Sequence, residues 1–171
     1  QAGLLVTLGL CTGLMGHTLA VVVGVAALIQ ASALAFTALK LAGAAYLLYL
    51  AWQSFRSTGG APASKAQPAL KGGQLYRRGI IMNITNPKVS IFCLAFLPQF
   101  ADPARGSVAV QVLLLGALFI LSTLIVFGSV ALAAGAIGPW LQRSTRVQKN
   151  MNRLAGTVFA ALALKLVTAQ R

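Results

Sequence analysis

Long uninterrupted runs of apolar residues, separated by short polar segments, dominate the chain. A helix needs about 20 residues to cross the roughly 30 Å hydrocarbon layer of a bilayer, and five runs meet this requirement. They cover residues 4–29, 33–52, 79–100, 108–132 (with an extension to 138) and 154–169. Because the runs are continuous rather than alternating, they predict helices and not barrel strands. The pattern therefore predicts an all-α, polytopic membrane helix bundle.

The composition supports this fold class and argues against most others. Only 9% of the residues are charged, against roughly 25% in a soluble domain. Cys11 and Cys93 lie far apart within apolar runs, which favours buried small side chains over a redox or metal site. The sequence has no membrane-embedded acid, HExxH, GxSxG or phosphate-binding loop. We therefore predict no enzyme, no catalytic residue, no metal and no cofactor.

Fourteen of the fifteen charged residues are basic, and the one acid is Asp102. Because most of these charges flank the apolar runs, they indicate topology and contact with lipid headgroups rather than nucleic-acid binding. Segment 53–78 contains five basic residues, segment 139–153 contains four, and the turn at 30–32 contains none. Both basic loops are therefore predicted to be cytoplasmic, with residue 1 inside and residue 171 outside. Segment 53–78, rich in Gly, Ser and Pro, is expected to be a flexible linker.

An internal repeat is suggested by two short segments. Both Lys40–Tyr46 and Arg153–Phe159 follow the pattern basic-LAG-x-x-aromatic. In the predicted topology the two segments run in opposite directions, as in a transporter with an inverted 3+3 repeat. The counterpart of 79–100 would then precede Gln1. We therefore expect that the chain lacks about 35 N-terminal residues and shows five spans of six.

The third run is interrupted at its middle by Asn86 and Pro87. Proline removes a helical hydrogen bond at the carbonyl of Asn83, and it disfavours helical geometry at the residue before it. Asn86 can cap a new half-helix that begins at Pro87. The N-terminus of that half-helix would offer free N–H groups and partial positive charge to a carboxylate at the membrane midplane. The alternative is a kink that serves packing only.

Lys88 follows the break directly, at the midpoint of its span. A charge there costs at least ~2.5 kcal/mol, so this lysine should face a polar cavity, titrate or pair with a substrate. The alternative is a lysine bonded to carbonyls freed at the break.

Three further polar side chains lie within other spans. His17, the only histidine, is a candidate proton relay or a satisfied core residue, on a helix where Gly9 and Gly13 permit close packing. Thr18 and Ser122 are candidate cavity hydroxyls, although such groups also bond their own helix.

Three motifs carry a family resemblance. Gly43–Leu47 reads GAAYL, residues 86–88 read NPK and Phe96–Phe100 reads FLPQF. With these motifs the chain resembles the LysE/RhtB amino-acid exporter family over essentially its whole length. The resemblance implies an exporter of amino acids or related metabolites in the bacterial inner membrane, driven by the proton gradient. Members of the family begin with a helix that bears a Pro-Gly-Pro motif, absent here, and often carry an acid where this chain has Ser122.

The combined prediction is a secondary transporter with alternating access. Its partners would be protons, membrane lipids and a small amino acid, with a neutral one favoured because no membrane-embedded acid is present. The sequence is also compatible with a homo-oligomer. The main alternative is a non-transporting membrane subunit or scaffold. The expected substrate-binding residues are Asn83, Asn86, Pro87 and Lys88, and His17 is the candidate for the proton relay.

Overall fold

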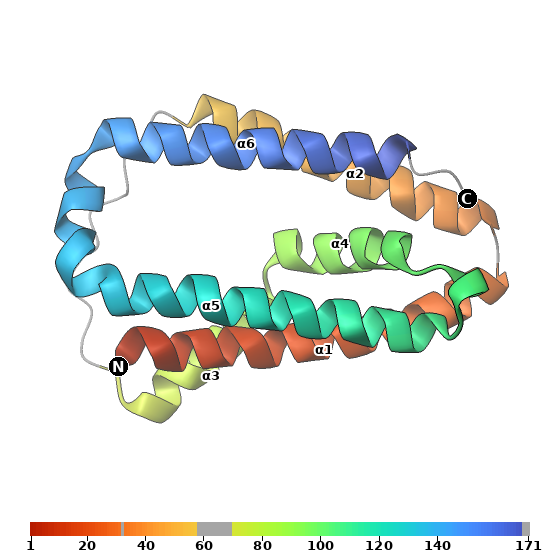
Figure 1. Ribbon diagram of the computed structural model, residues 1–171, viewed down its shortest axis with the longest axis horizontal. Coiled ribbons are helices and arrows are strands. Elements are labelled where there is room, and N and C mark those ends of the chain that lie inside the picture. The colour runs from red at the N-terminus through yellow and green to blue at the C-terminus, as the bar shows by residue number, and fades with distance from the viewer. Residues whose placement is uncertain (32, 58–69, 169–171) are drawn as a thin grey trace.

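The computed structural model describes residues 1–31, 33–57 and 70–168, and within them it contains helices and no strands. The elements follow one another along the chain as drawn in Figure 1. They are α1 (Ala2–Ala31), α2 (Ala33–Arg56), α3 (Gly72–Ile84), α4 (Pro87–Phe96), the 3-10 turns η1 (Leu97–Phe100) and η2 (Pro103–Arg105), α5 (Val108–Arg143) and α6 (Thr145–Thr168). The predicted all-α membrane fold class is confirmed.

The helices run back and forth along the long axis of the molecule, so that α6 ends at the opposite end from the start of α1 (Figure 1). By length and apolar composition, three described helical segments could each cross a membrane: Ala2–Gly24, Val108–Ala133 and Thr145–Thr168. The pair formed by α3 and the segment Pro87–Phe100 qualifies as a fourth, broken span. The predicted count of five spans stays a prediction.

Two of the predicted loops are shorter than expected. The segment expected as a loop over 139–153 is helical except for Ser144, because α5 continues to Arg143 and α6 begins at Thr145. The linker expected over 53–78 is helical up to Arg56 and again from Gly72, while 58–69 lie outside the described residues. Lys, Arg and Gln are good helix formers, so a helix can continue past its apolar run into water.

Helices α1 and α3 pack closely through glycine. A Cβ atom added to Gly9 would lie 2.9 Å from Cα of Gly79, and one added to Gly13 would lie 2.6 Å from Cβ of Asn83. Neither position leaves room for a side chain, so the two backbones approach as small residues allow in membrane helices. The predicted close packing at Gly9 and Gly13 is confirmed, and the partner is the helix that leads into the break.

The helices form two groups, with α4 between them. Helices α1, α3 and α5 lie side by side in one group, and α2 pairs with α6 in the other (Figure 1). One buried cluster includes Leu14, Cys93 and Val112, and the other includes Leu47, Ala95 and Leu166. Phe92 of α4 packs against both clusters. The half-helix after the break therefore joins the two groups.

Candidate functional site

The helix break lies where the sequence predicts it. Helix α3 ends at Ile84, α4 begins at Pro87, and the two segments are bent by 55°. Asn86 has an extended backbone (φ −82°, ψ 105°) and caps α4, with Pro87 in the first turn. The proline lacks the N–H that a continuous helix would need here, so it starts a new helix instead.

The start of α4 differs from the expectation in one respect, because its N–H groups already have partners. The N–H of Lys88 donates to Oδ1 of Asn86 at 3.1 Å. The N–H groups of Val89 and Ser90 both donate to the main-chain oxygen of Asn86, also at 3.1 Å. The expectation of free donors for a carboxylate is therefore wrong, because the asparagine cap takes them. What remains for an anion is the positive end of the helix dipole and the side chain of Lys88.

Asn83 lies at the end of α3 and is the most constrained polar residue at the break. Its main-chain oxygen accepts from the N–H of Asn86 at 3.1 Å and lies 3.3 Å from Nε2 of His17. The residue is 4% exposed, and among the buried side-chain nitrogen and oxygen atoms of the described residues only its Oδ1 has no hydrogen-bond partner. Because buried polar groups are normally paired, this oxygen is a natural acceptor for a ligand or a water molecule.

The side chain of Lys88 points toward α6, in the group formed by α2 and α6. Its Nζ lies 4.1 Å from the centroid of the Phe159 ring on α6. In the described part of the chain this ammonium group has no hydrogen bond to the carbonyls at the break, so it does not satisfy the carbonyls that the proline frees. A cation over an aromatic face gains about 0.5–1 kcal/mol at an exposed site. Among the described residues the ion pair joins Asp102 to Arg105, so Lys88 has no acidic partner there. The aromatic ring therefore holds the Lys88 ammonium in position, but no negative charge in that part of the chain compensates it.

An apolar cavity of about 230 Å³ lies between the α4–η1 segment and α5. The Phe92 ring is stacked on Phe96 at 4.7 Å between centroids and lies 5.2 Å from Phe119 of α5. At the far end, Nζ of Lys165 lies 4.5 Å from the centroid of Phe100. The lining residues are Phe92, Phe96, Leu97, Phe100, Leu115 and Phe119. The sequence prediction missed this cavity, although Lys88, Phe92, Phe96 and Phe100 follow one another at intervals of four.

Thr18 and Ser122 use their hydroxyl groups within their own helices. Thr18 donates to the carbonyl of Leu14 and Ser122 to that of Leu118, each at 2.8 Å. Thr18 is buried, and its side chain fills the space in front of Gly116 on α5. Neither residue lines the apolar cavity. The structure therefore brings His17 to Asn83 but gives these two hydroxyls no contact with the break.

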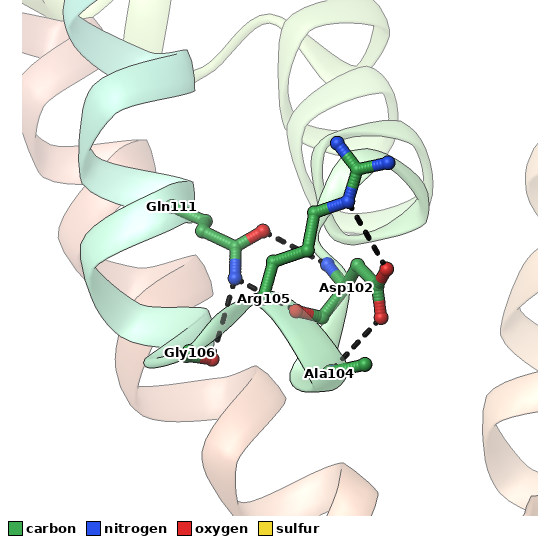
Figure 2. A network of polar contacts seen from close by, with 5 residues as sticks. All are labelled: Asp102, Ala104, Arg105, Gly106 and Gln111. Atoms are coloured by element: carbon green, nitrogen blue, oxygen red, sulfur yellow. Dashed lines mark hydrogen bonds and ion pairs between the residues drawn. The ribbon is translucent and has the colours of Figure 1, made fainter.

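The only acid of the chain, Asp102, belongs to the turn between α4 and α5 (Figure 2). Its carboxylate accepts from the N–H of Ala104 at 2.9 Å and lies 3.4 Å from Nε of Arg105. The side-chain amide of Gln111 bonds both the main-chain N–H and the main-chain oxygen of Asp102, at 2.9 and 2.8 Å. Asp102 thus shapes a turn, and the charge at the break comes from Lys88 alone.

Long apolar helices, with a broken pair beside a buried amide and a lysine, define a polytopic helical membrane protein. The family of LysE type translocators matches residues 1–170, and the chain belongs to this family. The protein is therefore a translocator rather than an enzyme, as the sequence predicts.

Several relatives have similar sequences. An uncharacterized membrane protein of Vibrio cholerae is 38% identical over 164 residues, which are 95% of this chain and 78% of that protein. A homoserine/homoserine lactone efflux protein of Salmonella typhimurium is 36% identical over 162 residues, with the same two shares. A leucine efflux protein of Enterobacter is 27% identical over 149 residues, covering 85% of this chain and 69% of that protein. No solved structure matches the chain significantly.

Proposed function

We propose that this protein exports neutral amino acids or related small metabolites across the bacterial inner membrane in exchange for protons. The observation that carries the proposal is the lysine at the broken span, held over an aromatic ring without an acidic partner. The match to the translocator family and the efflux proteins among the relatives also support export. A substrate carboxylate would supply the anion that Lys88 lacks.

The substrate would bind at the break through Asn83, Asn86, Pro87 and Lys88. Its carboxylate pairs with the Lys88 ammonium at the positive end of α4. The unpartnered Oδ1 of Asn83 accepts a hydrogen bond from the substrate or its bound water. Asn86 and Pro87 would hold the half-helix in place. Their main chain would not donate to the ligand, because Pro87 has no N–H and the N–H of Asn86 donates to Asn83.

Alternating access would move the α2–α6 pair against the group formed by α1, α3 and α5. Helix α2 runs antiparallel to α6, and α1 runs antiparallel to α5, as an inverted repeat requires (Figure 1). Lys88 and Phe159 join the two moving parts, so a carboxylate that draws Lys88 away would loosen this contact. His17, whose Nε2 lies 3.3 Å from the main-chain oxygen of Asn83, would carry the coupled proton.

The orientation follows from the basic segments. The end of α2, the start of α3 and the α5–α6 junction lie at one end of the molecule (Figure 1). The described parts of the basic segments 53–78 and 139–153 therefore lie at the same end, which by the positive-inside rule would be the cytoplasmic one. The opposite end, with Asp102, would face outward.

Export by bacteria that carry the full-length protein tests the proposal. Cells loaded with a labelled neutral amino acid through a dipeptide should release it faster than cells without the protein. Lys88→Ala and Pro87→Ala should abolish this release at an unchanged membrane level, whereas Lys149→Ala, on an exposed position of α6, should not. Normal release by the first two variants would overturn the site. No release by the unmodified protein would favour a non-transporting subunit.

A further inference from the structure

The apolar cavity between α4 and α5 has no role in carboxylate recognition, and its position suggests another one. Lys88, Phe92 and Phe96 follow at intervals of four on α4, so they share one face of the helix. Four residues of helix advance by roughly 6 Å, so Phe92, the nearest wall of the cavity, stands one turn beyond the lysine.

The cavity is partly open, so its apolar lining, more than its volume, restricts what can bind. Its volume of about 230 Å³ is below the roughly 300–1,000 Å³ of pockets that take drug-sized ligands. It exceeds the roughly 150 Å³ of an apolar cavity that takes benzene. All six lining residues are Phe or Leu, so a hydroxyl or charged group placed there would lose its hydrogen bonds.

We propose that this cavity is the side-chain subsite of the transporter and that it selects amino acids with large apolar side chains, such as leucine. This inference rests on the proposed function, in which Lys88 holds the carboxylate. Phe92 links the two parts of the site, because it lines the cavity and also packs against the cluster that Phe159 adjoins. Alanine would leave most of the cavity empty, and homoserine would bring an unpaired hydroxyl into it.

Two variants change the cavity in opposite directions. Phe119→Ala enlarges it and should raise the export of phenylalanine relative to leucine. Leu115→Phe fills it and should lower the export of leucine relative to alanine. Because one methylene in an apolar pocket already changes selectivity by roughly tenfold or more, each ratio should shift by at least about that factor.

The controls lie on the same helix. Phe127 and Leu114 of α5 are exposed and do not line the cavity, so Phe127→Ala and Leu114→Phe should keep the export ratios of the unmodified protein. Membrane levels of all variants are measured by immunoblot, and ratios between substrates do not depend on those levels. Because each variant changes its own export ratio, the test can still be read when one of the two fails to fold.

The outcomes separate the inference from the function on which it rests. Opposite shifts of the two ratios support the subsite. If the unmodified protein exports leucine but each cavity variant changes the export of all substrates by the same factor, the subsite is wrong and the exporter function stands. If the unmodified protein exports none of the amino acids, the proposed function itself fails.

Discussion

His17 lies against the main-chain carbonyl that Pro87 deprives of its helical partner, with Nε2 of His17 3.3 Å from the oxygen of Asn83. In a continuous helix this oxygen would accept the N–H of residue 87, which proline lacks. A carbonyl oxygen only accepts, so Nε2 carries the proton in this contact. Helix α1 is thereby tied to the bend, and the histidine combines a structural contact with a titratable group.

These two roles of His17 can be separated by substitution. His17→Gln keeps a donor for Asn83 but cannot titrate, whereas His17→Ala removes both properties. We expect His17→Gln to support substrate counterflow in proteoliposomes and to lose stimulation by a pH gradient. His17→Ala should also lower stability by about 1 kcal/mol, the net worth of a typical hydrogen bond. Undiminished stimulation of His17→Gln by the gradient would exclude the histidine as the relay.

Pro87→Ala restores the missing N–H and should allow α3 and α4 to join as a straighter helix. The 55° bend should decrease, which lengthens the distance between spin labels at Arg77 and Leu94, two exposed positions on either side of the break. Pro103→Ala is the matched control, because Pro103 stands in the exposed turn η2 and not at the break. An unchanged distance in Pro87→Ala would show that tertiary packing, and not the proline, sets the bend.

The break could be predicted because its causes are local. Asn86 and Pro87 are adjacent in sequence, and proline chemistry fixes the end of one helix and the start of the next. The free N–H groups were predicted wrongly because the same Asn86 accepts from Lys88 with its side chain and from Val89 and Ser90 with its carbonyl. Only the partner of the Lys88 N–H depends on the rotamer of Asn86, whereas Val89 and Ser90 donate to its main-chain oxygen at the first turn of the helix.

The cavity could not be predicted because it depends on contacts between distant segments. The spacing of Phe92, Phe96 and Phe100 is visible in the sequence, but Leu115 and Phe119 reach them only through the turn at Asp102. In the same way, Gly9 was identifiable as a close-packing position, whereas its partner Gly79 was not. Periodicity assigns a face to each helix, and only packing decides which faces meet.

The contact between Gly9 and Gly79 makes a stability prediction. Gly9→Leu would place a side chain against the backbone of α3, and overpacking of this kind costs typically about 1–3 kcal/mol. Gly16→Leu on the same helix is the control, because no heavy atom lies within 4 Å of a Cβ added there. Thermal unfolding in detergent should show a lower midpoint for the first variant only. Equal midpoints would mean that α1 and α3 are not held at this distance.

Lys165 makes the last prediction, since it stands at the end of the cavity opposite Lys88. Its Nζ lies 4.5 Å from the centroid of Phe100, which lines the cavity. A carboxylate that leaves Lys88 would find its next cation there, on the predicted outward side. Lys165→Met keeps the aliphatic chain but removes the charge, so export should slow severalfold while the ratio of leucine to alanine export stays constant. Lys149→Met, exposed on the same helix, should leave the rate unchanged. A normal export rate in Lys165→Met would restrict this lysine to contact with Phe100, whereas an altered substrate ratio would place it in the side-chain subsite itself.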